Sequence, residues 1–111
     1  WGDQPPSPTL ANFSGDVGRT MAIGSYPGGA SPSGVHDMAG NVFEWVADWF
    51  DPGYYGLSPE LNPLGPESGT QKVVRGGSWG DFGFLLRAAN RGILTPNAAF
   101  NFIGFRCVKD V

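Results

Sequence analysis

Cysteine, histidine, basic charge and long hydrophobic runs are all scarce in this 111-residue sequence. The single cysteine, Cys107, excludes an intrachain disulfide. No apolar run approaches the roughly 18 residues that a membrane-spanning segment needs. Seven Lys and Arg against ten Asp and Glu leave a net charge of -3, which argues against a nucleic-acid partner because phosphate binding requires a basic patch. No signal peptide is visible, and a start at Trp1 rather than Met predicts a processed product or a fragment.

Turn-forming and aromatic residues, by contrast, are plentiful. The chain has 18 Gly and 10 Pro, accompanied by 4 Trp, 8 Phe and 3 Tyr. Disordered chains lack such aromatics, so this composition predicts a compact domain with many turns and little helix. The core of so short a chain is marginal if it must also support long loops. We therefore expect a metal, a protein partner or a missing N-terminal half to add stability.

The hydrophobic pattern predicts a β-rich domain with much irregular structure. Alternation of apolar and polar residues predicts a first strand over 42–50, and two further strands are expected over 72–79 and 103–108. Residues 21–23 are compatible with an edge strand, and residues 87–91 with a short strand or a turn. Between the first two strands lies a Pro/Gly-rich excursion, residues 51–71, of a length that is usually functional or pinned by something.

A family resemblance rests on four segments in a fixed order. They are residues 37–45 (DMAGNVFEW), 75–79 (RGGSW), 87–91 (RAANR) with Thr95-Pro96, and 104–108 (GFRCV). In this order they resemble the C-terminal half of the formylglycine-generating enzyme family, also called the sulfatase-modifying-factor domain. The resemblance implies an α+β, β-rich, C-type-lectin-like fold with short helices. It also implies that residues 1–111 form a single module that is incomplete at its N-terminus.

The same resemblance implies one or two calcium ions, which favour carboxylate and carbonyl oxygens. The matching positions of the first site are the Asp37 and Glu44 side chains with the Gly40 and Val42 carbonyls. From spacing alone, a simpler reading is that Asp37 caps a turn and Glu44 pairs with an arginine.

A second calcium site would match Asn12, Phe13, Asp16 and the Gly18 carbonyl. Asn12 also begins a glycosylation sequon that ends at Ser14, and a glycan would compete with calcium for its side chain.

Catalysis by the chemistry of the resembled oxidase is not expected. That enzyme uses two nearby cysteines to bind copper(I), a metal suited to soft thiolates. Here Asp81 stands at the first cysteine position, the second has no counterpart, and Cys107 is expected to fill space in a core strand. His36 is expected to be a surface or turn residue and Ser78 to tie a turn, while Asp48 is expected to pair with Arg75, Arg87 or Arg106. No catalytic residue and no copper site are predicted.

A ligand-binding face is expected in the C-terminal loops, which also resemble the variable proteins of diversity-generating retroelements. Its candidate residues are Asp81, Phe82, Phe84, Leu94, Phe100 and Phe102. Such an apolar cluster marks an interface, unless the rings pack on the missing half or on the chain's own core.

The sequence thus favours a non-catalytic, calcium-stabilised module of an extracytoplasmic protein, whether secreted, periplasmic or at the cell surface. It would bind a protein or glycan ligand, or act as an accessory or structural subunit. The rival hypothesis is a formylglycine-generating oxidase that activates sulfatases, or another family enzyme, with its active residues in a missing N-terminal part.

Overall fold

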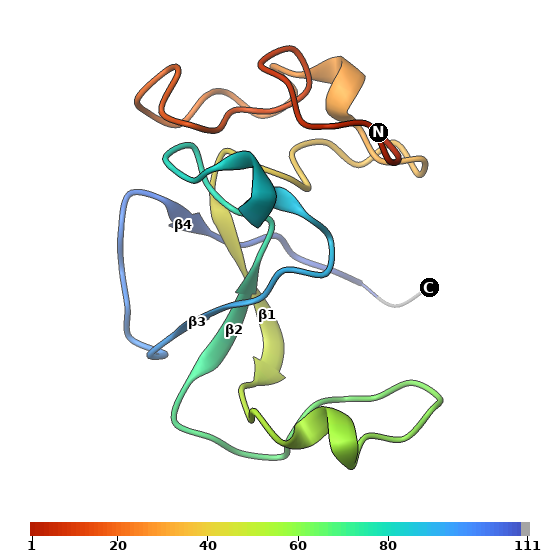
Figure 1. Cartoon of the computed structure of the whole chain (residues 1–111). Coiled ribbons are helices and arrows are strands. Elements are labelled where there is room, and N and C mark those ends of the chain that lie inside the picture. Colours follow the sequence, from red (N-terminus) through yellow and green to blue (C-terminus); the bar gives the residue numbers. More distant parts are fainter. Residues whose placement is uncertain (110–111) are drawn as a thin grey trace.

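A four-stranded mixed sheet organises the computed structural model, which describes residues 1–109 (Figure 1). The strands are β1 (Phe43–Trp49), β2 (Lys72–Arg75), β3 (Gly92–Leu94) and β4 (Ile103–Gly104). Their order across the sheet is β3-β2-β1-β4. β1 pairs with β2 and β2 with β3 in antiparallel fashion, whereas β4 lies parallel to β1.

Strand β2 is the most deeply buried element. Its adjacent residues Val73 and Val74 are each 1% exposed. Successive side chains of a strand point to opposite faces, so β2 is covered on both sides of the sheet. In the pairing of β2 with β1, Trp45 lies opposite Val74, and the register then shifts at an irregularity before Trp49.

The first predicted strand is confirmed nearly in full, and the second and third are shorter than predicted. The first spans almost the whole predicted range, but the second ends at Arg75, because Gly76 and Gly77 adopt left-handed backbone angles of 93° and 73°. Residues 87–91 form the turn that the sequence left open, and β3 directly after them was not predicted.

Two expectations about the edges of the sheet are wrong. Residues 21–23 form no edge strand, because both backbone groups of Met21 are hydrogen-bonded to the side chain of Asn41. The last strand stops at Gly104 rather than at 108, so Cys107 lies outside it and is exposed. The prediction that this thiol fills space in a core strand is therefore wrong, since the chain has already left the sheet.

Irregular backbone from the first 40 residues lies over one end of the sheet (Figure 1). In the described part of the chain the short helices are three 3-10 turns: η1 (Pro27–Gly29), η2 (Tyr54–Gly56) and η3 (Gly83–Leu86). A small core joins this layer to η3 through Ala11, Phe13 and Leu86. Among residues 1–109 no helix has the length and apolarity needed to cross a bilayer.

The excursion over 51–71 extends from the opposite end of the sheet and contains η2 (Figure 1). It is pinned by side chains. The guanidinium of Arg91 lies 4.8 Å from the centre of the Tyr55 ring and 5.5 Å from that of Phe50. The hydroxyl of Tyr54 accepts a hydrogen bond from the Gly65 amide at 3.1 Å.

We predict that Gly40→Ala destabilises the fold by about 2 kcal/mol or more, because it combines left-handed backbone strain with overpacking. Gly40 has φ of 77°, and an added Cβ would overlap the carbonyl oxygen of Asn12. The control is Gly56→Ala, where no atom lies within 4 Å of the new methyl group. Urea denaturation followed by tryptophan fluorescence measures both, and equal midpoints would contradict the prediction.

Candidate functional site

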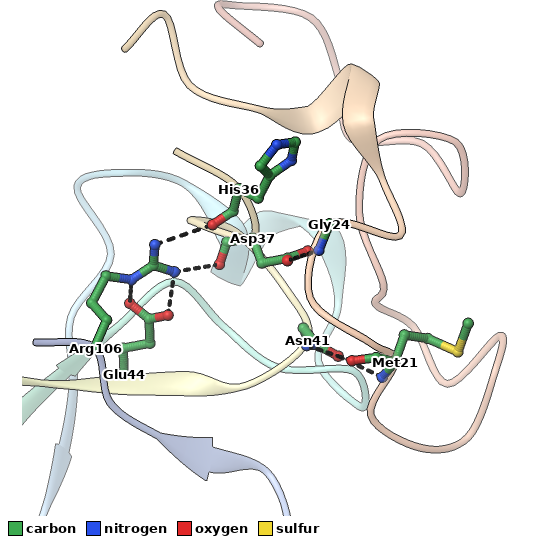
Figure 2. Close-up of polar contacts among 7 residues, drawn as sticks. All are labelled: Met21, Gly24, His36, Asp37, Asn41, Glu44 and Arg106. Carbon is green, nitrogen blue, oxygen red and sulfur yellow. Dashed lines mark hydrogen bonds and ion pairs between the residues drawn. The ribbon is translucent and has the colours of Figure 1, made fainter. Parts of the chain in front are cut away.

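The side chain of Asn41 joins the N-terminal layer to the sheet (Figure 2). Its Oδ1 accepts the Met21 amide at 2.8 Å, and its Nδ2 donates to the Met21 carbonyl at 3.2 Å. Its own amide donates to the Asn12 carbonyl at 2.8 Å, and its carbonyl accepts the Trp79 amide at 3.0 Å. Asn41 is only 8% exposed, so these bonds meet the polar requirements of a buried amide.

The loop that begins at Asn12 is closed by its first residue. Asn12 Nδ2 donates to the Arg19 carbonyl at 2.9 Å and to Asn41 Oδ1 at 3.2 Å. The side-chain oxygen of Asn12, Oδ1, is buried and has no hydrogen-bond partner within the described part of the chain. Left-handed backbone angles at Ser14, Gly15 and Gly18 curl the loop tightly.

A buried amide oxygen without a partner is costly, so this oxygen calls for an electropositive partner. Calcium accepts amide and backbone oxygens as ligands. Of the residues matched to this calcium site, Phe13 is buried beside Asn12, whereas Asp16 and Gly18 lie on the exposed part of the loop. The Asn12 loop therefore offers one unpartnered oxygen that such an ion could use.

The guanidinium of Arg106 forms an ion pair with the carboxylate of Glu44, a ligand of the other candidate calcium site (Figure 2). Its Nε donates to Glu44 Oε2 at 2.6 Å, and its Nη2 bonds the second oxygen. The same guanidinium donates to the carbonyls of His36 and Asp37 at 3.1 and 3.2 Å. The hydrogen bond to Glu44 is the largest cause of the raised pKa of Arg106.

The carboxylate of Asp37 faces the other way and ties down the 21–24 turn. Its Oδ2 accepts the Gly24 amide at 2.8 Å (Figure 2). Asp37 and Glu44 nevertheless line one cavity of about 190 Å³, together with Val42 and Arg106. His36 also lines it, and its buried Nδ1 has no hydrogen-bond partner among residues 1–109.

The simpler interpretation of these two acids is thus present: Asp37 caps a turn and Glu44 pairs with an arginine. A calcium ion here would have to share Glu44 with Arg106. Within residues 1–109 no three His, Cys, Asp or Glu side chains gather in a way that could hold a metal. Either calcium candidate would depend on backbone and amide oxygens beside one or two carboxylates, a composition that calcium accepts.

A second cavity, of about 200 Å³, lies in the C-terminal loops. It is lined by Ser78, Trp79, Gly80, Asp81 and Phe102. Asp81 Oδ2 accepts the Ser78 amide at 2.8 Å and the Ser78 hydroxyl at 2.5 Å. Ser78 therefore ties the turn after the double glycine, as its position predicts.

The phenylalanines of the predicted binding face form two stacked pairs. Phe82 and Phe84 have ring centres 6.0 Å apart, and Phe100 and Phe102 lie 5.0 Å apart with nearly parallel planes. The first three are 67, 62 and 53% exposed, which excludes the alternative that they pack into the chain's own core. Phe102 and Leu94 are half-buried.

The predicted partners of Asp48 are wrong. Arg106 pairs with Glu44, Arg75 donates to the carbonyls of Ala88 and Asn90, and Arg87 donates to that of Phe84. These arginines hold loop carbonyls because turns leave more acceptors unpaired than a regular ladder does. Sequence reasoning missed Asn41 as a site residue, although its place between Gly40 and Val42 in the 37–45 motif could have suggested it.

Comparison with known proteins gives a consistent result. The family model of the sulfatase-modifying factor enzyme 1-like domain matches residues 3–111. The serine/threonine-protein kinase Pkn1 of Chlamydia trachomatis serovar L2 is 44% identical over 89% of this chain and 16% of its own length. The formylglycine-generating enzyme of Streptomyces coelicolor is 42% identical over 69% of this chain and 26% of its own length.

Solved structures of similar fold also match this chain. PvdO from Pseudomonas aeruginosa superposes with a TM-score of 0.76 and 32% identity, over 94% of this chain and 40% of that one. Treponema denticola variable protein 1 gives 0.70 and 27%, over 87% of this chain and 34% of that one. The fold predicted from the sequence is confirmed, and the chain spans less than half of each of these proteins.

We predict that Arg106→Ala destabilises the chain by about 2 to 3 kcal/mol, because it removes charge-assisted hydrogen bonds and leaves Glu44 unpaired. Arg106→Lys should recover less than half of this loss, since an ammonium cannot form the planar fork. Urea denaturation measures both, with Arg19→Ala as the control at an exposed arginine. Full stability in Arg106→Lys would show that charge alone matters.

Proposed function

The chain belongs to the family of the sulfatase-modifying factor enzyme 1-like domain, and we propose that it acts there as a non-catalytic, calcium-stabilised binding module. One observation carries the proposal. The C-terminal loops carry two stacked phenylalanine pairs, three of whose four rings are largely exposed, and Phe102 of one pair lines the Ser78–Asp81 cavity. Exposed aromatic rings of this density are typical of binding surfaces.

The lack of a thiol pair supports a non-catalytic role. Copper(I) chemistry of the resembled oxidase needs two cysteines close together. This chain has one, Cys107, which lies beyond β4. The position of the first catalytic cysteine is held by Asp81, whose carboxylate is tied to Ser78.

Calcium would stabilise the loops that frame the binding face. The Asn12 loop would hold one ion through Asn12 Oδ1, the Phe13 and Gly18 carbonyls and the Asp16 carboxylate. The orphaned Asn12 oxygen supports this assignment. When bound, the ion supplies positive charge to the Asn12 side-chain oxygen, which otherwise lacks a donor among residues 1–109.

A second ion would engage Asp37, Gly40, Val42 and Glu44. Arg106 already neutralises Glu44, so we expect this site to bind more weakly. Such sites fill where calcium is abundant, which favours an extracytoplasmic location.

The exposed rings would contact a protein or glycan ligand, or another subunit of an assembly. The two outcomes differ in what covers the rings. Reversible ligand capture leaves them exposed in the free protein, whereas a structural subunit or the rest of a longer polypeptide covers them permanently.

Chelation of calcium should lower the melting temperature. A ligand that binds only the native state at 100 times its dissociation constant adds about 2.7 kcal/mol of stability. For a chain of this size that equals about 10 to 20 °C. Calorimetry with excess calcium and with excess chelator measures the difference.

Two matched variants assign the effect to a loop. Asp16→Asn should remove most of the calcium-dependent shift in melting temperature, because it removes a carboxylate ligand. Asp16 is exposed, so the substitution should cost the metal-free fold little. Asp51→Asn removes the same charge from a distant turn and should leave the shift intact. Identical melting curves in calcium and chelator would refute the calcium part of the proposal.

Copper and oxygen provide the test of the non-catalytic part. We expect no oxygen consumption when the chain is mixed with copper(I) and a cysteine-containing sulfatase peptide. Turnover that disappears in Cys107→Ser would establish the rival oxidase function instead.

A further inference from the structure

The Ser78–Asp81 cavity contains a carboxylate that no cation neutralises. Within residues 1–109 the one ion pair joins Arg106 to Glu44, far along the chain from Asp81. Both hydrogen bonds that Asp81 accepts from Ser78 end on Oδ2. Its Oδ1 accepts none in the described part of the chain and is not among the buried unpartnered atoms there, so it remains open to a partner from solvent.

The frame around this carboxylate is fixed by backbone hydrogen bonds. The Asp81 carbonyl accepts the Ser14 amide at 2.8 Å, and the Trp79 carbonyl accepts the Gly15 amide at 2.7 Å. The Trp79 amide donates to the Asn41 carbonyl at 3.0 Å. A ligand that enters the cavity therefore meets groups already in place, which lowers the entropy cost of binding.

Two aromatic residues line the same cavity as Asp81. Trp79 and Phe102 both contribute to its wall, and Phe102 is stacked against Phe100 at 5.0 Å. Aromatic faces attract cations through their quadrupoles, with tryptophan the strongest. A carboxylate that shares one cavity with a tryptophan and a phenylalanine is therefore suited to a cation, and the overall charge of -3 adds to the attraction.

The count of lone pairs selects the kind of cation. A guanidinium binds a carboxylate best through both oxygens at once. Here the two donors of Ser78 already fill the acceptor positions of Oδ2, which leaves one oxygen. A primary ammonium needs only one such oxygen and can direct its remaining N–H groups to water, while its alkyl chain lies on the rings.

We propose that this cavity binds primary alkylammonium groups, with Asp81 Oδ1 as the anionic acceptor and Trp79 and Phe102 as the walls. The proposal rests on the binding function proposed above and names the chemistry of its ligand. The group would come from a free amine or from a lysine side chain, and the cavity volume of about 200 Å³ fits either one.

The test is a titration of the 15N-labelled chain with n-butylammonium, followed at the amides of Ser78, Gly80 and Asp81 and the Trp79 indole. Saturable shifts at these signals are expected, and n-butanol at equal concentration should give none. Butylguanidinium should bind more weakly than butylammonium. Nα-acetyl-lysine methylamide, compared with butylammonium, distinguishes a lysine side chain from a free amine as the preferred source.

Asp81→Asn is the decisive variant, because an asparagine oxygen can still accept both donors of Ser78 while the charge is lost. The dissociation constant for butylammonium should rise about tenfold or more. Asp51→Asn, which loses the same charge from a turn outside the cavity, should bind as the parent chain does. Phe102→Leu should weaken binding several-fold without changing the Ser78 turn.

Equal affinity in the parent chain and Asp81→Asn would overturn the proposal, as would equal binding of butanol or tighter binding of butylguanidinium. Should Asp81→Asn fail to fold, unchanged affinity in Phe102→Leu would overturn it equally. A chain that ignores butylammonium but melts earlier in chelator keeps the calcium-stabilised module and loses only the ammonium site. A chain that binds butylammonium but melts at the same temperature in chelator keeps the ammonium site and loses the calcium part of the proposed function.

Discussion

The buried amide of Asn41 is the constraint on which the rest of this molecule depends. Its side chain satisfies both backbone groups of Met21, and its backbone bonds reach Asn12 and Trp79. Three segments that have no regular hydrogen-bond ladder between them are therefore joined at one residue. Because a buried polar group without a partner costs about 1 to 3 kcal/mol, separating these segments at Asn41 would be costly.

The same junction links the calcium candidates to the binding face. The Asn12 loop bonds to the carbonyls of Trp79 and Asp81 through Ser14 and Gly15. An ion that fixed this loop would therefore also fix the wall of the cavity at Asp81. In this way an ion in the Asn12 loop could improve ligand binding without touching the ligand, because the ligand would meet a cavity wall that is already ordered.

At the other candidate loop, Arg106 would compete with a calcium ion for Glu44. The guanidinium neutralises Glu44 and also donates to the carbonyls of His36 and Asp37. It thus satisfies, from a single side chain, oxygens that a cation would otherwise satisfy. The Asn12 oxygen has no such substitute within residues 1–109. This difference explains why we assign the tighter calcium site to the Asn12 loop.

The sequence alone determined the family, the β-rich class and the first two strands, because apolar alternation and an ordered set of motifs are local signals. It also placed Ser78 in its turn, since the double glycine before it marks where the strand must end. Only the tertiary structure decided that Glu44 meets Arg106, that residues 21–23 bond a side chain instead of a strand, and that Cys107 is exposed. Those outcomes depend on contacts between residues 20 to 62 positions apart. A local sequence pattern does not determine which distant donor lies beside a given oxygen in the folded chain.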